Sequence, residues 1–384
     1  MKVKKTIFYI LTTFLFLSLF LVLDYILSNT LLANQNCYEI EKYYYQLKKN
    51  CKAKHKFKKS FPSVNIYTDK YGLRVSKNFT DRNPNKKNIF IFGDSFTFGE
   101  GLEYEETFVG LIEKKLNNYN VYNFGVSSYS PSVYIYKLKQ KIKNKIFPEK
   151  ILLFLDLTDV HDESARWNYD LEKNLIKLNN QEVFDRNKQN IDFTSKNFKI
   201  AKEISSILNF NLRILRSKIS NSFNKKNKAI RVKQSIQGQF TYKKLENLDK
   251  EFWKDVNFEK GLNNIRRNIN LVGDISKKYN SEFYLIIYPW AETLEFGENE
   301  FSWSGFGYDL CIKANCKLIN TIPSFIEYKK NSKNWVNELY FVNDEHFNSK
   351  GAKELAKIVI NKIKWSLLRK PSDWTKQKFK NDYW

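Results

Sequence analysis

The amino-acid sequence predicts an α/β fold in which a mostly parallel sheet is covered by helices on both faces. Short apolar runs that end in turns, amphipathic helical stretches, and the regular alternation of the two lead to this prediction. Of the 384 residues, 42% are hydrophobic and 16% are aromatic, so the chain can bury a large core. This composition excludes a disordered basic protein.

The apolar run at residues 88–95, NIFIFGDS, is the first predicted strand of the sheet, because it is short and ends in a turn. A helix is predicted from about 105 to 116, and Pro131 is expected to open the next one. The remaining predicted elements are a strand and loop at 121–128, a helix at 131–145, strands at 150–157, 283–288 and about 317–320, and helices at about 259–279 and 349–364.

Residues from about 165 to 255 interrupt this alternation. They are polar and rich in Asn and Lys, and we interpret them as an insertion that contains one amphipathic helix near 199–222. The expected parts of the chain are a cytoplasmic N-terminus at 1–5, a transmembrane anchor at 6–27, a basic juxtamembrane stalk and lead-in at 28–87, the α/β domain with its insertion at 88–364, and a basic aromatic tail at 365–384.

The anchor is predicted because residues 6–27 are almost wholly apolar, with Asp24 as the only charge. At about 1.5 Å per residue, this run can cross a hydrocarbon core of roughly 30 Å. A cleaved signal peptide is the alternative, but residues 31–33 have leucine where a cleavage site needs a small side chain. Lysines cluster directly before the helix, whereas two acids and one lysine follow it closely. We therefore expect a single-pass protein of the cell inner membrane whose domain faces the periplasm.

The net charge of +24 lies mainly in three segments, which carry +21 between them. These are residues 42–59, 213–233 and 362–384, and all three lie outside the predicted catalytic motifs. Such segments would suit contact with anionic lipid or an acidic envelope polymer. A basic composition produced by an AT-rich genome is the alternative, and the charge alone decides little.

The four cysteines form two local pairs in the sequence, Cys37 with Cys51 and Cys311 with Cys316. In an oxidising compartment these pairs could form two disulfides. Four buried thiols are the alternative. A zinc site is a weaker third, because the pairs are far apart in sequence and have no histidine beside them.

Gly93-Asp94-Ser95 ends the first predicted strand, where open α/β sheets place reactive groups. A serine on a tight turn at the start of a helix can present its hydroxyl group to a crevice lined by backbone N–H groups. Ser95 is therefore a candidate nucleophile.

A serine nucleophile needs a base, which at neutral pH is usually a histidine. The chain has three histidines. His55 lies in the Lys-rich segment and is expected to be a solvated surface residue. His161 follows the third predicted strand and could line the crevice, and His346 lies beside a carboxylate just before the last helix. His346 is the candidate base.

In this order the motifs resemble those of the SGNH/GDSL hydrolases, a superfamily of serine esterases and acyl-transfer enzymes with a flavodoxin-like three-layer α/β/α fold. The resemblance covers roughly residues 88–166 and 259–364. It implies that Ser95 is the nucleophile, that the N–H groups of Ser95 and Gly125 hold the oxyanion, and that His346 is the base.

Two positions depart from the commoner family pattern. Thr158 stands where the family usually has an asparagine in the oxyanion hole, and its hydroxyl could donate one hydrogen bond instead. The commoner place of the acid, three residues before the histidine, holds Asn343. Asp344, two residues before His346, resembles the arrangement in alginate-acetylation-type relatives, and we expect Asp344 to be the acid.

Three polar side chains near the predicted crevice, Asp94, Asp159 and His161, are expected to contact substrate. A metal site in the acid-rich stretch 159–163 is the less favoured alternative. Trp290, in an aromatic patch, could stack on a sugar ring or lie at the edge of the core. We expect neither a metal nor a cofactor.

The resemblance and the predicted export imply an enzyme that hydrolyses acyl esters, with O-acetyl groups on envelope glycans or glycolipids as the expected substrate. The alternatives are an O-acyltransferase that works with a membrane-bound acyl-donor protein, and a catalytically inactive glycan-binding scaffold. Membrane lipid is an expected partner through the N-terminal helix. Nucleic acid is not, because the exported chain has no recognised nucleic-acid motif.

Overall fold

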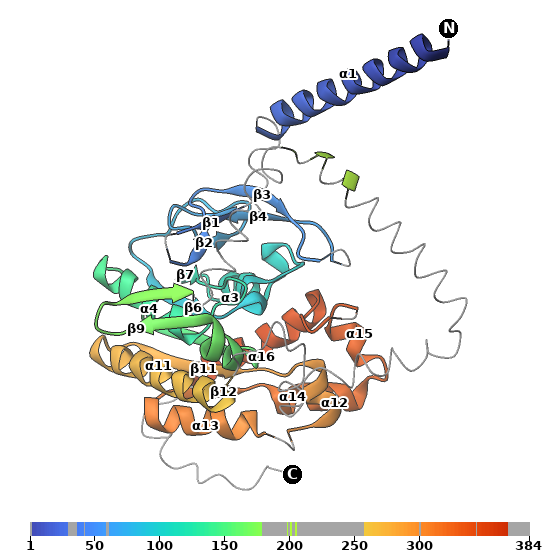
Figure 1. Cartoon of the computed structure of the whole chain (residues 1–384). Helices are drawn as coiled ribbons and strands as arrows, with labels where there is room; N and C mark the ends of the chain where they lie inside the picture. The colour runs from blue at the N-terminus through green and yellow to red at the C-terminus, as the bar shows by residue number, and fades with distance from the viewer. Residues whose placement is uncertain are drawn as a thin grey trace. The chain divides into compact units, whose positions relative to one another are not determined.

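The computed structural model of the protein describes residues 2–29, 37–41, 43–58, 61–178, 257–298, 301–342 and 344–367, together with residues 198, 200, 201, 204 and 205. These residues belong to two compact units, one of which contains helix α1 and the other the central sheet (Figure 1).

Helix α1 (Lys2–Asn29) contains the predicted anchor. Its segment Lys5–Ser28 has a mean hydropathy of 2.4 and is long and apolar enough to cross a membrane, a property that an N-terminal signal sequence shares. Within the same unit, the carboxylate of Asp24 accepts the backbone N–H groups of Ile200 at 3.0 Å and Ala201 at 2.8 Å. The single charge of the apolar run is therefore hydrogen-bonded.

The central sheet has five strands in the order β12-β11-β8-β6-β7, and every pairing is parallel. The strands are β6 (Lys87–Phe92), β7 (Tyr119–Asn123), β8 (Lys150–Leu155), β11 (Glu282–Ile287) and β12 (Lys317–Asn320). Counted in chain order this is 2-1-3-4-5, the flavodoxin-like order. All six residues of β8 are buried, as expected of a strand with helices on both faces. The predicted fold class is confirmed.

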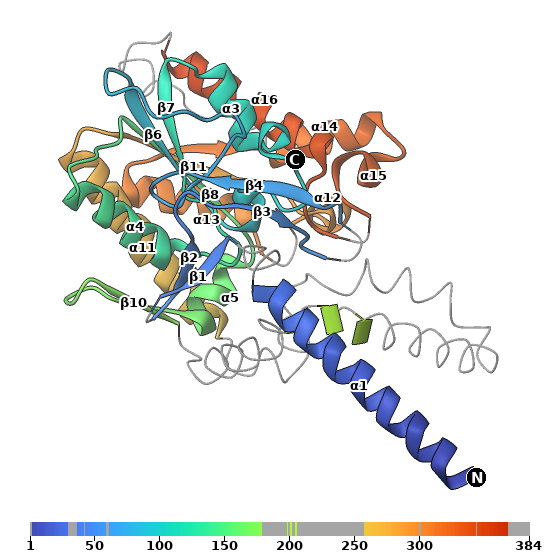
Figure 2. The same ribbon diagram turned by 90° about the horizontal axis from the view of Figure 1, so that it is seen from above.

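Helices cover the two faces of this sheet (Figure 2). The helices on one face are α3 (Phe108–Lys115) and α16 (Ser349–Leu367), and those on the other are α4 (Pro131–Lys143), α11 (Phe258–Lys278) and α13 (Trp303–Ala314). Side chains alternate between the faces. Ile91 and Phe154 lie in the core beside α3 and α16. Phe92 packs against Tyr134 of α4 instead, with 6.0 Å between ring centroids.

The predicted sheet strands and long helices agree with these elements to within a few residues. The predicted helix at 105–116 is a 3₁₀ turn (Tyr104–Glu106) followed by α3, because the Thr107 side chain accepts the Gly110 N–H at 3.0 Å and caps a new helix. The sequence analysis did not predict α13, nor the shorter helices α12 (Ala291–Phe296), α14 (Ile322–Asn331) and α15 (Trp335–Leu339).

The described residues of the segment predicted as a basic stalk include five strands, and from Tyr38 onward the segment belongs to the same compact unit as the sheet. The strands are β1 (Tyr38–Ile40), β2 (Tyr45–Leu47), β3 (Lys52–His55), β4 (Val64–Thr68) and β5 (Arg74–Val75). The run CKAKHKFK at 51–58 alternates lysine with other side chains, and in β3 the lysines are exposed while Ala53 is buried. This period of two, which indicates a strand with one solvated face, was not used in the prediction.

The predicted insertion begins with a two-stranded sheet of β9 (Trp167–Asp170) and β10 (Leu175–Leu178). Most of the predicted helix at 199–222, the basic segment 213–233 and the tail beyond 367 lie outside the described residues.

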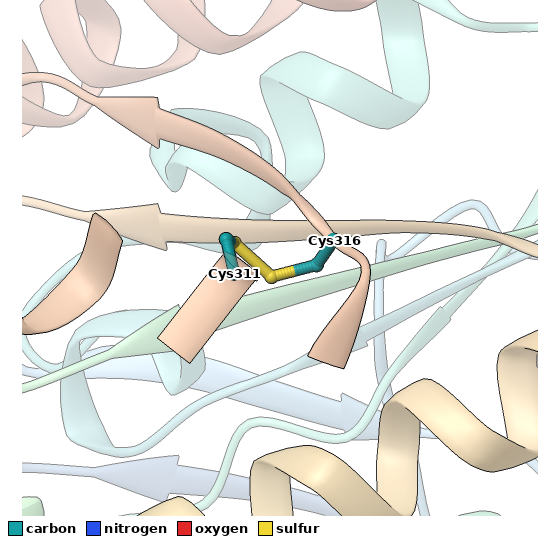
Figure 3. Close-up of a disulfide and its surroundings, with 2 residues drawn as sticks. All are labelled: Cys311 and Cys316. Atoms are coloured by element: carbon teal, nitrogen blue, oxygen red, sulfur yellow. A yellow bond between two sulfur atoms is a disulfide. The ribbon is translucent and has the colours of Figure 1, made fainter. Parts of the chain in front are cut away.

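All four cysteines lie in the described part of the chain, and none is a free thiol. Cys311, near the end of α13, bonds to Cys316, just before β12, with 4.5 Å between their Cα atoms (Figure 3). Cys37 and Cys51 are disulfide-bonded as well.

Candidate active site

Ser95 lies where β6 ends and the short helix α2 (Ser95–Phe98) begins. Asp94 caps this helix, because its Oδ1 atom accepts the Phe96 N–H at 3.0 Å. A Cβ atom on Gly93 would lie 1.9 Å from Thr97 Oγ1, so the turn requires glycine there. The turn leaves Ser95 partly exposed, while its neighbours on both sides are buried.

His346 and Asp344 lie beside Ser95. His346 Nε2 is 2.8 Å from Ser95 Oγ, and His346 Nδ1 is 2.5 Å from Asp344 Oδ1. The same Asp344 oxygen accepts the His346 backbone N–H at 3.0 Å. The three predicted catalytic residues therefore lie together: Asp344 orients the His346 imidazole, and the imidazole reaches the Ser95 hydroxyl. Asn343, the other candidate position for the acid, lies outside the described residues.

The loop that carries His346 is a tight hairpin before α16. Tyr340 and Phe347 form an antiparallel bridge, and Phe341 N–H donates to the His346 carbonyl at 2.9 Å. Asn348 closes the loop, because its side chain donates to the Tyr340 carbonyl at 3.0 Å and its Oδ1 atom accepts N–H groups at the start of α16. These contacts fix the direction in which His346 points.

Aromatic rings enclose the imidazole of His346, which is only 3% exposed. Phe96 stacks on it with 4.7 Å between ring centroids, and Phe57 meets it edge-on at 5.1 Å. Lys58, also from the Lys-rich segment, forms an ion pair with Asp344 Oδ2, the oxygen that does not face His346. The sequence analysis missed Phe57 and Lys58, because it took their segment for a stalk.

The charges of this group support the assignment of a base and an acid. Burial alone would lower the pKa of His346, but the hydrogen bond with Asp344 and the charges of Glu345 and Asp344 outweigh burial and raise it. Burial opposes ionisation of Asp344 too, yet its hydrogen bonds with His346 and Lys58 lower its pKa to about 2. Asp344 is therefore a carboxylate at neutral pH.

The groups predicted to hold the oxyanion beside Ser95 are less ready for catalysis than His346 and Asp344. The Ser95 N–H forms no hydrogen bond with any residue in the described ranges, which leaves it available to a ligand. The Gly125 N–H donates to Asn123 Oδ1 at 2.9 Å within its own turn. Gly125 lies against the serine turn, because a Cβ atom there would be 2.5 Å from Phe98 N. Its predicted role requires that the bond to Asn123 open when substrate binds.

Thr158, the third predicted oxyanion donor, also has a partner. Its hydroxyl and its backbone N–H both donate to Asp156 Oδ1, at 2.5 and 2.8 Å. The side chain closes a local turn after β8 instead of pointing a free donor at the crevice. The structure therefore gives no support to Thr158 as the substitute for the family's asparagine.

Asp94 and Asp159, predicted to contact substrate, are buried structural groups. Besides capping α2, Asp94 Oδ2 lies 3.1 Å from Ser95 Oγ, and Asp159 accepts the Asp156 N–H at 2.9 Å. Both side chains are 3% exposed or less, and burial followed by the charge of a neighbouring aspartate raises the pKa of each. Both are too enclosed to contact a large substrate.

His161 and Trp290 are buried too, which argues against substrate contact by His161 and against sugar stacking by Trp290. Both are 3% exposed or less. Burial lowers the pKa of His161 to about 4, so this imidazole is neutral at neutral pH. Trp290 Nε1 donates to Asp156 Oδ2 at 2.8 Å, which fixes the ring in the core. Of the two interpretations of the aromatic patch, the structure supports the core edge at Trp290.

Two residues of the lead-in strands, Arg74 and His55, contact the end of α2 and the loop that follows it. The sequence analysis assigned a role in the site to neither. Arg74 is fully buried and donates to the Phe98, Gly99 and Leu102 carbonyls. His55 Nε2 lies 2.7 Å from Glu100 Oε2. The expectation that His55 is a solvated surface residue was wrong, because β3 turns it toward the loop that follows α2.

The contacts around His346 and in the acid-rich stretch 159–163 do not favour a metal site. Ligand atoms of Asp344, Glu345 and His346 lie within 4.8 Å of one another. His346 Nδ1 already faces Asp344, however, and the other Asp344 oxygen faces Lys58. In the predicted acidic stretch, Glu163 is likewise occupied, since it accepts hydrogen bonds from Ser130, Ser132 and Asn268.

The structure is similar to solved structures of esterases. The psychrotrophic esterase EstA from a Pseudoalteromonas species matches 74% of this chain and 100% of its own, with 13% identity and a TM-score of 0.39. The acetyl xylan esterase AlAXEase matches 73% of this chain and 100% of its own, with 14% identity and a TM-score of 0.37. AlinE4, an SGNH-hydrolase family esterase, matches 74% of this chain and 98% of its own, with 15% identity and a TM-score of 0.34.

No protein-family model matches the chain, and no curated protein does.

Proposed function

We propose that this protein is an SGNH/GDSL-type serine hydrolase that cleaves acyl esters, with Ser95 as nucleophile, His346 as base and Asp344 as the acid that orients it. One observation carries the proposal: the connected contacts from Ser95 Oγ to His346 Nε2 at 2.8 Å and from His346 Nδ1 to Asp344 at 2.5 Å. A serine, a histidine and a carboxylate in this relation form the group that activates a serine hydroxyl.

In the proposed reaction, Ser95 Oγ attacks the ester carbonyl while its proton passes to His346 Nε2. The Ser95 N–H, joined by the Gly125 N–H once it leaves Asn123, stabilises the oxyanion. The intermediate expels the alcohol, which takes the proton from His346 and leaves an acyl group on Ser95. Water then attacks this acyl-enzyme with His346 again as base, and the carboxylic acid is released.

The proposed substrate is an O-acetyl group on a cell-envelope glycan or glycolipid. Helix α1 supports this class, because it is long and apolar enough to hold the protein in a membrane. The two disulfide-bonded cysteine pairs suit an oxidising compartment such as the periplasm. The proposed location is therefore the inner membrane, with the site on the periplasmic side.

The test is the rate of hydrolysis of a chromogenic acetyl ester by the full chain in detergent. Ser95→Ala should lower this rate by about 10⁴-fold or more, because the nucleophile is lost. Ser332→Ala, at the end of α14 and outside the site, is the matched control and should keep the rate. Equal rates for Ser95→Ala and the unchanged protein would overturn the proposal.

A second function, a catalytically inactive glycan-binding scaffold, is favoured by one observation. Two of the three predicted oxyanion donors, Gly125 N–H and the Thr158 hydroxyl, already have partners. This alternative expects no ester hydrolysis above background and an unchanged cellular phenotype for Ser95→Ala. If the protein is instead an O-acyltransferase, it should hydrolyse little ester alone. It should transfer the acyl group to a glycan once a membrane-bound acyl-donor protein is added.

A further inference from the structure

A cavity of about 250 Å³ lies between the lead-in strands and helix α4, and neither Ser95 nor His346 lines it. We call it the α4 cavity. The lining residues on which the inference rests are Lys49, Tyr71, Lys137, Gln140, Lys141 and Asn144. The last four recur on α4 and its C-cap at intervals of three and four residues, so they share one face of the helix.

The lysines of the α4 cavity have no anionic partner within the described residues. None of Lys49, Lys137 and Lys141 forms an ion pair with a carboxylate there. Lys141 is only 9% exposed, and its Nζ atom lies 3.8 Å from the centre of the Tyr71 ring. Lys137 Nζ donates to Gln46 Oε1 at 2.7 Å, a neutral partner. A buried cation without a counter-ion is costly, and such groups mark candidate binding sites.

Three carboxylates influence these lysines through their charges, Asp69 at Lys141 and Glu39 and Glu41 at Lys137, but none forms a described ion pair with either lysine. Asp69 forms an ion pair with Arg82 and accepts the Tyr71 and Leu73 N–H groups. Glu39 and Glu41 both accept hydrogen bonds from Gln46 Nε2, at 2.9 and 2.8 Å. Their charges offset the burial of the two α4 lysines only in part, because the pKa of each lysine is still lowered.

Burial lowers the pKa of both lysines of α4. Loss of water and the charge of Lys141 lower the pKa of Lys137 to about 7. Loss of water also lowers the pKa of Lys141 to about 8, although the charge of Asp69 acts in the opposite direction. An anion placed between the two ammonium groups would favour their charged forms.

The remaining walls of the α4 cavity suit a sugar ring. Tyr44 and Tyr71 supply aromatic rings, and Gln140 and Asn144 supply amide groups that can bond to hydroxyls. The volume corresponds to roughly eight waters at about 30 Å³ each, room for one ring with its anionic group. We propose that the α4 cavity binds an anionic sugar unit, whose carboxylate or phosphate group pairs with Lys137 and Lys141.

Calorimetric titration of the full chain in detergent tests this proposal, with Ser95→Ala as background so that catalysis plays no part. At about pH 6, below the pKa of both lysines, glucuronic acid and glucose 1-phosphate should bind saturably, and neutral glucose at least about tenfold more weakly. Lys141→Gln and Lys137→Gln should each weaken binding of the anionic sugars by about tenfold or more. Lys143→Gln, at an exposed lysine of the same helix outside the cavity, should not.

Each contrary result overturns a stated part of the proposal. Equal affinities of Lys141→Gln and Lys143→Gln, or no saturable binding of either anionic sugar, would overturn the site. Inorganic phosphate that binds as tightly as glucose 1-phosphate would overturn the sugar part. Because Lys141→Gln removes an unpaired buried charge, its melting temperature should not fall, and loss of binding would not reflect unfolding. The binding measurement is independent of whether Ser95 proves catalytic.

Discussion

The two sides of Ser95 differ in how far they are prepared for chemistry. On the base side, His346 and Asp344 are already joined to the serine hydroxyl by contacts of 2.8 and 2.5 Å. On the oxyanion side, the Gly125 N–H and the Thr158 hydroxyl already donate hydrogen bonds to side chains of their own turns. Preorganised donors lower a barrier because they need not rearrange during the reaction. We therefore expect the oxyanion side of Ser95, and not the base side, to limit the rate of the proposed ester hydrolysis.

The largest expected loss of rate comes from a substitution on the base side of Ser95. Asp344→Asn should lower the rate of acetyl-ester hydrolysis by about 10⁴-fold, because the amide can hold His346 in the wrong tautomer and cannot stabilise its protonated form. Asn343→Ala is the matched control and should change the rate by less than about tenfold. Steady-state kinetics with the chromogenic ester measure both. A larger loss for Asn343→Ala than for Asp344→Asn would show that Asn343, and not Asp344, orients His346.

The next effect tests the oxyanion side. Gly125→Ala places a Cβ atom 2.5 Å from Phe98 N and from the Thr97 carbonyl carbon, so the turn must move away from α2. The rate per folded molecule should fall by about 10²-fold, the usual cost of a lost oxyanion donor. Gly307→Ala in α13, where the new methyl group meets only side chains, should keep it. A folded Gly125→Ala protein with an unchanged rate would remove Gly125 from the mechanism.

A smaller effect concerns the link between Lys58 and the base side. His346 must be neutral to accept the serine proton, so the rate should fall as the pH drops through its raised pKa. Lys58→Met removes a positive charge near the imidazole, so the pKa of His346 should rise and the acid limb of the pH–rate profile should move to higher pH. The plateau rate should change by less than about tenfold, because the Lys58 side chain is 45% exposed and screened by water.

Lys54→Met, at an exposed lysine of β3, controls for the loss of a general positive charge and should leave the profile in place. An acid limb that moves equally in Lys54→Met and Lys58→Met would show that the ion pair with Asp344 has no specific influence. Salt should reduce the difference between Lys58→Met and the unchanged protein, since the pair is partly exposed.

The smallest expected effect is at Thr158. Thr158→Val keeps the shape of the side chain and removes the hydroxyl that donates to Asp156. If the hydroxyl serves only this turn, the rate should fall by less than about fivefold. A loss of about 10²- to 10³-fold, measured with the same ester, would show that Thr158 turns toward the oxyanion in the substrate complex and would make the two sides of Ser95 more alike.

Much of the fold was predictable because its signals are local. The five sheet strands are short apolar runs bounded by turns, and their alternation with helices predicts a mostly parallel sheet. The role of the Lys-rich segment was missed although its alternation of lysine with Cys51, Ala53 and His55 is visible in the sequence. The charge of eight lysines favoured a solvated stalk, and the tertiary contacts of Arg74 and His55 outweighed that preference.

Local patterns and the family resemblance indicated which residues could form the site. Gly93-Asp94-Ser95 had to follow a strand, and Asp344 and His346 had to precede the last helix, because the spacing of apolar and turn residues fixes where each element ends. The tertiary structure alone decided which groups meet and which donors are free. Lys58 reaches Asp344 across 286 positions of the chain, and Asn123 rather than a ligand takes the Gly125 N–H. Such contacts depend on packing in space, which no local pattern encodes.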